Sequence, residues 1–463
     1  MSRHPVAAPD RASTLSYWLL IAFLAILWVA GGASRADVLG QSAVRFSAWT
    51  IIAVAILALP RVDWRAVKEP AIILGAAALL VALQLVPLPP AVWSELPGRA
   101  IFTEAAVLTG SAQPWRPLSI SPSGTANALG SLIVPAVVLL LAANLTREQH
   151  WQIAIFVLAL VAAGAVLGVL QFSGASFDNP FTNDMPGDVS GNFANRNHFA
   201  LFLAMGCVLS LAWAFRARAA GWRVAAGFGL LTILVLMILA TGSRSGVIVG
   251  LFAIVLAFIA FRDRVVQQLK RMPHKLAMPL VAGVVCVMVA LVALSIGLDR
   301  AASIDRVGMM ETDADLRFRI WPVVLNMAQH YFPAGSGFGA FDQVFRISEP
   351  DHLLYPRYIN LAHNDWAQLT LEGGMLGMIL FALILFWFAT RSVRAWSSAE
   401  AESSSRLFAR VGSIIISLVL FASITDYPAR TPIVMALLAL AAIWLANARS
   451  CAPGSRLNHS DIA

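Results

Sequence analysis

The sequence predicts an all-α membrane protein of about twelve transmembrane helices, and three properties of the chain support this class. Apolar residues make up 59 % of the 463 residues, and charged residues make up only 13 %. The mean hydropathy is +0.75, whereas soluble domains are about half apolar and a quarter charged. Apolar runs of roughly 17–25 residues, each able to cross about 30 Å of hydrocarbon, recur along the chain. We therefore expect one polytopic membrane domain over residues 1–463.

Each predicted span is an apolar run between polar or turn-forming segments. The runs are 15–31, 43–59, 70–86, 127–143, 150–170, 197–215, 222–241, 246–261, 277–297, 364–390, 409–425 and 431–447. The first run follows a short polar head with Arg3 and Arg11, so a cleaved signal peptide is the alternative. We favour a retained helix, because the run continues without a clear small-residue cleavage site.

The distribution of Lys and Arg predicts the orientation of the spans. Basic residues gather in "FRARAAGWR" and "FRDRVVQQLKRMPHK", which are inner segments if the N-terminus is cytoplasmic. Both termini then lie in the cytoplasm of a bacterial cell with the chain in its inner membrane. The net charge of +8 follows from this bias and gives no reason to expect nucleic acid as a partner. The three cysteines form no disulfide framework or metal motif.

Two predicted outer segments are too long to be simple connections. Residues 87–126 are rich in Pro and Trp, and residues 298–362 form a large loop between the ninth and tenth spans. Loops of this length between membrane helices are usually functional. Within the second loop, "DADLRFRIWPVVLNMAQHYFP" has an acidic start, an apolar stripe and a final Pro. This pattern predicts an amphipathic helix that lies at the outer surface.

The tenth span begins with polar side chains at membrane depth, where an ionised group costs about 2.5–3.5 kcal/mol. Asp365, Gln368 and Glu372 are spaced i, i+3 and i+7, so they share one helix face. Asn364 or Asp365 is the expected N-cap, which places His363 just outside the first turn and facing an outer cavity. The alternative is a set of capping and packing residues, with Glu372 holding the bundle together.

A second candidate site is "LATGSRSGVIVG", residues 239–250, which joins two apolar spans with almost no loop. Its one charged residue is Arg244, set in a frame of Gly and Ser that satisfies the backbone at the break. An Arg beside the start of the following helix suits a phosphate oxyanion. Snorkelling of this Arg to the lipid headgroups is the alternative.

The predicted amphipathic helix supplies a third candidate group. Arg317 and Trp321 are four residues apart and share a face, and Arg319 lies between them. Phosphate capture at the membrane surface and simple binding of lipid headgroups are equally compatible with these residue types.

The fourth candidate is "GNFANRNHFALFL", residues 191–203, at the outer end of the sixth span. Asn192, Asn195, Asn197 and His198 suit hydrogen bonds to sugar hydroxyls. Capping of the following helix explains the same residues equally well. Asn195 and Asn197, together with Asn364 and Asp365 of the tenth span, are the possible substrate-binding residues.

All four candidates lie on the same predicted side of the membrane. The sequence has no P-loop, no carboxylate-rich metal motif and no Ser-His-Asp signature. Arginines with a histidine fit transfer from a lipid-anchored diphosphate, because guanidinium groups stabilise such a leaving group without a metal ion. The histidine then accepts the proton of an acceptor hydroxyl. A membrane transporter is the alternative from a different class, although the halves show no internal repeat.

The motifs, taken in order, resemble a known family. His363-Asn364 followed by Glu372, Gly374 and Gly377 resembles the signature of the O-antigen ligase and O-antigen polymerase superfamily. "TGSRSG", Arg317 before Trp321, "PAGSGFGAF" and "DYPARTP" resemble its other landmarks. The resemblance covers roughly residues 190–447.

This resemblance implies a glycosyltransferase-C-like fold that transfers a glycan from undecaprenyl diphosphate without a metal or other cofactor. Arg244 is similar to the membrane arginine that binds the donor diphosphate, and Arg317, or Arg319 in its place, to the loop arginine. His363 is similar to the catalytic histidine, and Glu372 matches the acid of the motif, with a structural or orienting role.

The acceptor is not specified by these motifs. Members of the superfamily attach glycans to lipid A core, extend a polysaccharide chain or modify Ser and Thr of secreted proteins. We expect lipid A core to be the acceptor, with a growing glycan or a protein as the alternatives, and the segments 87–126 and 298–362 to recognise it.

Overall fold

Helices dominate the described part of this computed structural model, which comprises residues 11–59, 62–175, 179–182, 187–216, 221–271, 313–354, 359–397 and 404–447. The long helices are α1 (Arg11–Ala30), α2 (Leu39–Ala58), α3 (Lys68–Leu83), α6 (Pro122–Ser131), α7 (Ile133–Ala142), α8 (Arg147–Phe172), α9 (Arg196–Ala214), α10 (Gly221–Ala240), α11 (Arg244–Arg271), α13 (Asp313–Tyr331), α15 (Asp365–Ser397), α16 (Ser404–Ala422) and α17 (Pro432–Ala446). The predicted all-α class is confirmed for this part of the chain.

Helices occur at eleven of the twelve predicted spans, and α6 and α7 together form one of them. Among the described residues, nine helical segments are long and apolar enough to cross a membrane. The helices α3 and α17 fall short, with 16 and 15 residues. The predicted span 277–297 lies outside the described residues, so the count of twelve stays a prediction. The chain is a multi-pass membrane protein.

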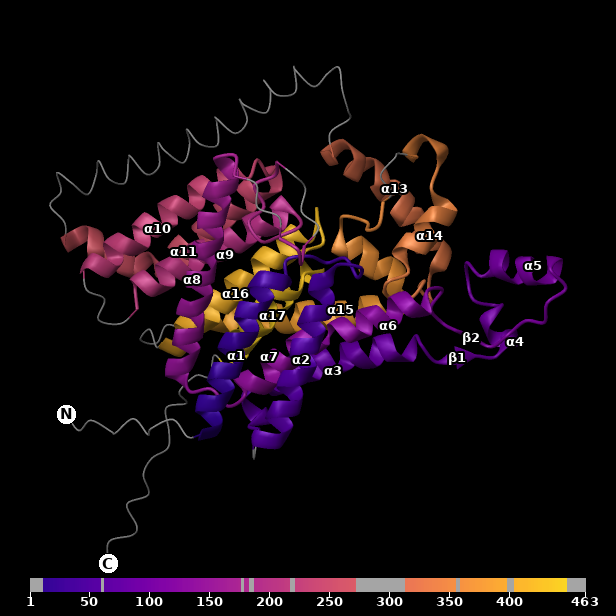
Figure 1. Ribbon diagram of the computed structural model, residues 1–463, viewed down its shortest axis with the longest axis horizontal. Helices are drawn as coiled ribbons and strands as arrows, with labels where there is room; N and C mark the ends of the chain where they lie inside the picture. The colour runs from indigo at the N-terminus through magenta and orange to yellow at the C-terminus, as the bar shows by residue number, and fades with distance from the viewer. Residues whose placement is uncertain are drawn as a thin grey trace, which may run out of the picture.

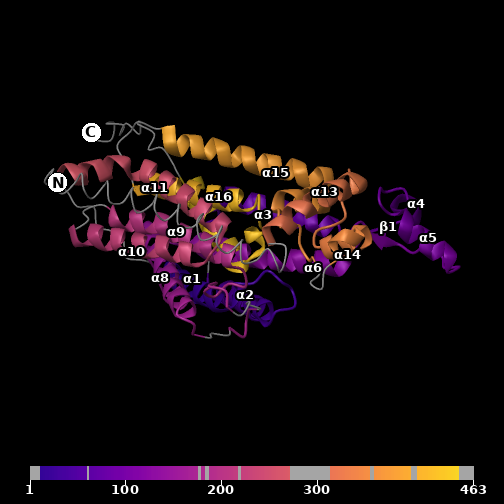
Figure 2. The ribbon, with the colours of Figure 1, turned by 90° about the horizontal axis from the view of Figure 1, so that it is seen from above.

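The bundle is elongated, and its two ends differ (Figure 1). Helices α8, α10 and α11 lie at one end, and α13 with the short α14 (Phe341–Ser348) lies at the other. Figure 2 shows α15 running along one side of the molecule, from beside α13 towards α11. The polar start of α15 is therefore at the α13 end.

Helix α9 is the centre of the core, and most of its side chains are fully buried. It packs against α8, α10, α11 and α16. Small residues allow close approach: a β-carbon on Gly246 of α11 would lie 2.4 Å from the Ala200 Cβ of α9. Lipid tails are as apolar as the side chains, so close packing rather than water exclusion holds such helices together.

Helix α15 is broken near its start by Gly374, whose φ of 55° and ψ of −151° are not helical. The break accommodates the glycine-rich turn, Pro333–Ala340. A β-carbon on Gly374 would lie 2.3 Å from the Pro333 carbonyl oxygen, so a side chain does not fit here. The polar first turns of α15 therefore form a short segment separated from the long apolar part.

The expected amphipathic helix is present as α13, and its apolar stripe is buried against protein. Ile320, Val324, Met327 and Tyr331 are each at most 3 % exposed, at the spacing of one helix face. The helix packs against α15 and α14. The apolar face is thus part of the fold, not a free membrane-binding surface as the sequence suggested.

The segment 87–126 contains a small two-stranded unit. Strands β1 (Pro87–Leu88) and β2 (Arg116–Pro117) pair antiparallel and enclose α4 (Pro90–Trp93) and α5 (Ala100–Leu108). In Figure 1 this unit lies beyond α13 and α14.

Arg99 fastens this unit to the bundle. Its side chain is 0 % exposed and donates to the carbonyl oxygens of Pro97 at 2.7 Å and of Leu118 and Gly335 at 2.8 Å. Burial lowers its pKa to about 10, so it stays charged at neutral pH. Charged donors to carbonyl oxygens make strong hydrogen bonds.

We expect Arg99→Met to reduce stability by about 2–4 kcal/mol, because it leaves buried carbonyl groups without a donor. Arg116→Met is the matched control: Arg116 is only partly buried and lies over the Trp93 ring at 4.7 Å, and its loss removes one cation–π contact worth about 1 kcal/mol. Thermal unfolding in detergent measures both. Equal midpoints for the two variants would refute the anchoring role of Arg99.

Candidate active site

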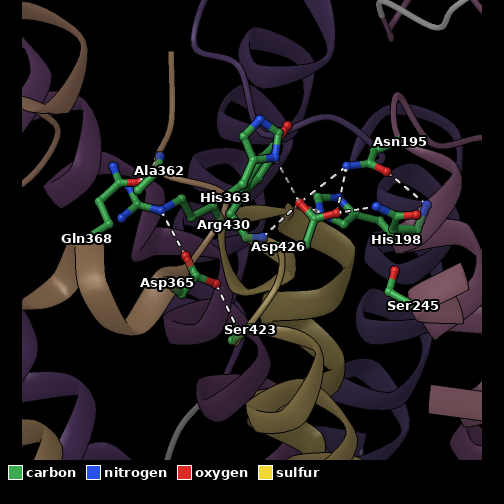
Figure 3. Close-up of polar contacts among 12 residues, drawn as sticks. Asn195, His198, Ser245, Ala362, His363, Asp365, Gln368, Ser423, Asp426 and Arg430 are labelled. Atoms are coloured by element: carbon green, nitrogen blue, oxygen red, sulfur yellow. Dashed lines mark hydrogen bonds and ion pairs between the residues drawn. The ribbon is translucent and has the colours of Figure 1, made fainter. Parts of the chain in front are cut away.

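The centre of the candidate site is the carboxylate of Asp426, which lies between α16 and the short helix η3 (Pro428–Arg430). Its side chain is 3 % exposed. Oδ2 accepts hydrogen bonds from Nδ2 of Asn197 at 2.6 Å and of Asn195 at 3.2 Å, and Oδ1 accepts from the Tyr427 backbone at 3.0 Å. Figure 3 shows these contacts converging from different elements. Several donors thus stabilise one buried negative charge.

The first turn of α9 supplies most of these donors. Asn195 is the N-cap, and its Oδ1 accepts from the backbone N–H of Asn197 at 2.8 Å. His198, one residue further, is 2 % exposed, and its Nε2 lies 3.5 Å from Oδ1 of Asp426. Its Nδ1 is 3.0 Å from the Thr431 hydroxyl. The capping interpretation is correct for Asn195, and the same turn also binds Asp426.

His363 approaches Asp426 from the opposite side (Figure 3). Its Nδ1 lies 3.7 Å from Oδ1 of Asp426, and its side chain is 23 % exposed. The ring leans on the Tyr427 ring at 4.9 Å between centroids. With Nδ1 directed at the carboxylate, Nε2 is the ring nitrogen left for a substrate proton.

The backbone of His363 is strained, with a φ of 50°, which is unusual for a residue other than glycine. Hydrogen bonds on both sides hold it there. The Ala362 N–H donates to Gln368 Oε1 at 3.0 Å, and Asn364 Oδ1 accepts from the Ala367 N–H at 3.0 Å. Asn364 is thus the N-cap of α15, one of the two residues that the sequence offered for this position. Strain maintained in this way is typical of functional positions.

A second group of side chains surrounds the partly exposed Arg430, beside the Asp426 cluster, that is, Asp426 with Asn195, Asn197, His198 and His363 (Figure 3). Its Nε donates to Asp365 Oδ1 at 3.1 Å, and Nη2 donates to Glu372 Oε2 at 3.2 Å. The other carboxylate oxygens also have donors: Ser423 for Asp365, and Gln368 with the Phe341 N–H for Glu372. Glu372 is 0 % exposed. Both acids of α15 are therefore bound internally.

Arg244 lies at the start of α11 and is exposed. The turn before it is connected to the Asp426 cluster by two hydrogen bonds. Ser243 donates to Asn197 Oδ1 at 2.6 Å, and Nδ2 of the same Asn197 donates to Asp426. One amide thus joins the turn that carries Arg244 to the carboxylate beside His363.

The other two candidate arginines, Arg317 and Arg319, are on α13. Arg319 is partly buried on α13, which packs against the start of α15 through its apolar stripe. Arg317 is on the same helix, and its side chain falls outside the described part of the chain. The choice between these two arginines as donor contacts stays open.

The sequence-based predictions include "DYPARTP" as a landmark but assign no site role to Asp426 or Arg430, and they do not single out Ser423. The available signal was an acid and a base in the short connector "SITDYPARTP", between two apolar spans. His198 was noted only as a sugar contact or capping residue. Within the described ranges, no three His, Cys, Asp or Glu side chains come together as a metal-binding group.

Comparison with known proteins supports the resemblance seen in the sequence. Residues 228–382 match the family described as O-antigen ligase. The match covers about a third of the chain and includes Arg244, His363 and Glu372, whereas Asn197 and Asp426 lie outside it. No curated protein matches the chain.

We expect Glu372→Gln to destabilise the fold by about 3 kcal/mol, because it removes one carboxylate from a buried ion pair. Thermal unfolding measures the loss, and Glu104→Gln on the exposed face of α5 is the control. At low temperature, the folded fraction of Glu372→Gln should retain activity. A stable variant without activity would instead assign a chemical role to Glu372.

We expect Asn197→Asp to be more harmful than Ser243→Ala. The new carboxylate would face Asp426 across the present 2.6 Å contact. Loss of the Ser243 hydroxyl removes neutral hydrogen bonds with Asn197 and Gly246 and places no new charge beside Asp426. The turnover of folded samples of the two variants, compared with that of the wild type, tests which substitution is more harmful. Equal activities of the two variants would show that turnover does not depend on the Asn197 amide that joins Asp426 to Ser243.

Proposed function

Because residues 228–382 match the family described as O-antigen ligase, we propose that this chain transfers a glycan from undecaprenyl diphosphate to an acceptor hydroxyl. The family implies an enzyme of the ligase or glycosyltransferase type. The observation that supports the proposal best is a partly exposed, backbone-strained His363 whose Nδ1 faces the buried Asp426. This arrangement suits a general base.

The reaction begins with the acceptor hydroxyl beside Nε2 of His363. The oxygen attacks the anomeric carbon of the glycan, and its proton passes to Nε2. Asp426 orients the ring and stabilises the imidazolium through Nδ1. The separation of 3.7 Å is long for a hydrogen bond, and catalytic contacts often shorten when substrate binds. General base catalysis of this kind contributes about 10²–10⁴-fold in rate.

The donor side requires stabilisation of the leaving group. The bond between the anomeric carbon and the phosphate oxygen breaks, and its electron pair leaves with undecaprenyl diphosphate. Arg244 is the proposed ligand of this diphosphate, aided by Arg317 or Arg319. Fixed guanidinium groups stabilise the developing charge, and we propose that neither a metal ion nor another cofactor takes part.

The orientation of the site follows from the proposed topology. The polar start of α15, the segment 87–126 and helices α13 and α14 lie at one end of the bundle (Figure 1). We propose that this end faces the periplasm and that both termini are cytoplasmic, in the inner membrane. Lipid A core is the favoured acceptor, because its hydroxyls are available in the same leaflet as the lipid-linked donor. A growing glycan or a secreted protein is the alternative.

The test uses the full-length protein in nanodiscs with an undecaprenyl-diphosphate-linked glycan. Lipid A core, a second lipid-linked glycan and a Ser-rich secreted protein are supplied as separate acceptors, with Mg²⁺ and with EDTA. Release of undecaprenyl diphosphate together with a larger product supports the proposal, and the productive acceptor identifies the branch. No release with any acceptor, from folded protein, would refute it.

We expect His363→Gln to lower kcat by at least about 10²-fold while the KM for the donor changes little, because the base acts in the transition state. The variant keeps a polar side chain of similar size. His330→Gln is the control, since His330 is exposed on α13. An unchanged kcat in His363→Gln would remove this residue from the mechanism.

A further inference from the structure

Arg196 belongs to the same helical turn as the Asp426 donors, but its guanidinium has a different position. Asn195, Asn197 and His198 approach Asp426. A β-carbon on Gly242 would lie 3.8 Å from Nη1 of Arg196. The guanidinium therefore lies against the turn Thr241–Ser245, which also carries Arg244. Its side chain is 41 % exposed.

The two segments that carry these arginines are held rigidly together. Gly242 has a φ of 61°, the region that favours glycine. The Ser243 hydroxyl donates to Asn197 Oδ1 at 2.6 Å and accepts from the Gly246 N–H at 2.8 Å. Helices α9 and α11 touch at Ala200 and Gly246. The positions of Arg196 and of the backbone at Arg244 are thus fixed relative to each other.

The carboxylate that pairs with Arg196 holds it loosely. Nη1 of Arg196 is 3.7 Å from Oδ1 of Asp188, and the Asp188 side chain is 35 % exposed. Exposed pairs at such distances contribute about 0–1 kcal/mol. A ligand with more negative charge and better geometry displaces such a partner at little cost.

We propose that Arg196 is a further ligand of phosphoryl oxygens at this site, and that with Arg244 it binds the diphosphate of the lipid-linked donor. The inference rests on the proposed function. A diphosphate presents oxygens on two phosphorus atoms, and the planar fork of a guanidinium binds such oxygens in pairs. In the absence of the ligand, the Arg196 guanidinium pairs with Asp188, so Asp188 competes with the donor diphosphate for it.

The position of Arg196 also suits the chemistry. Asn197, the next residue, contacts Asp426 with one end of its amide and Ser243 with the other. The diphosphate end of the donor and the base that activates the acceptor therefore lie on either side of one rigid turn. Such positioning of two reactants makes their reaction effectively unimolecular and so accelerates it.

The experiment compares Arg196→Ala, Arg196→Lys and Asp188→Asn. Arg346→Ala is the control, because Arg346 is an exposed arginine paired with Asp342 at 2.9 Å. We measure kcat and the KM for the donor in a non-ionic detergent. Binding of undecaprenyl diphosphate, followed by the shift in thermal unfolding, is a readout that needs no turnover.

We expect Arg196→Ala to raise the KM for the donor and the Kd for undecaprenyl diphosphate about 10–100-fold, as for the loss of a charged hydrogen bond. Arg196→Lys should recover part of this loss. Asp188→Asn should shift both constants in the opposite direction, and Arg346→Ala should leave them unchanged.

Three results would overturn the inference. If Arg196 and Asp188 form only a structural pair, both substitutions weaken binding alike. If Arg196 binds a phospholipid headgroup, its substitution has no effect in detergent and acts only in nanodiscs that contain phosphatidylglycerol. Unchanged constants in Arg196→Ala would exclude any role. If undecaprenyl diphosphate binds through Arg196 but the wild-type protein transfers no glycan, the proposed function is refuted and the role of Arg196 in binding stands.

Discussion

The buried charge of Asp426 is the constraint on which the arrangement of the site depends. A carboxylate removed from water is costly unless donors surround it. Asn195 and Asn197 come from the start of α9, about half the chain away, and His363 comes from the segment before α15. The need to surround the Asp426 carboxylate with hydrogen-bond donors therefore fixes three distant parts of the chain relative to one another.

Arg430, four residues further along, imposes a complementary constraint with the opposite sign of charge. It binds both acids of the polar α15 segment, Asp365 and Glu372. The connector between α16 and α17 thus supplies a carboxylate to α9 and a guanidinium to α15. Because a broken buried pair leaves an uncompensated charge, the two helices cannot shift independently. This rigidity explains how the strained backbone of His363 is maintained.

The sequence predicts most helices, because each apolar run carries its own signal. It also narrows the cap of α15 to Asn364 or Asp365, since a cap depends on neighbours within one turn, and the catalytic role of His363 stays a proposal. Asp426 has no role predicted from the sequence, because its partners Asn195 and Asn197 lie more than 200 positions away, and spacing within a segment cannot reveal such distant pairs. The break at Gly374 depends on the distant turn at Pro333. The apolar stripe of α13 looks the same whether lipid or α15 covers it.

The site separates groups by exposure in a way that matches their proposed chemical tasks. Glu372, His198 and Asp426 are buried and already paired or surrounded, so they serve to hold the geometry. His363 and Arg196 keep exposed surface, so a substrate can reach them. A transition state is stabilised best by groups that need not move when charge develops. Asn197 is where these two sets meet, because its one amide binds both the buried Asp426 and the turn beneath the arginines. In the proposed mechanism, its placement makes the distance between the base and the leaving group a property of the fold rather than of the substrate.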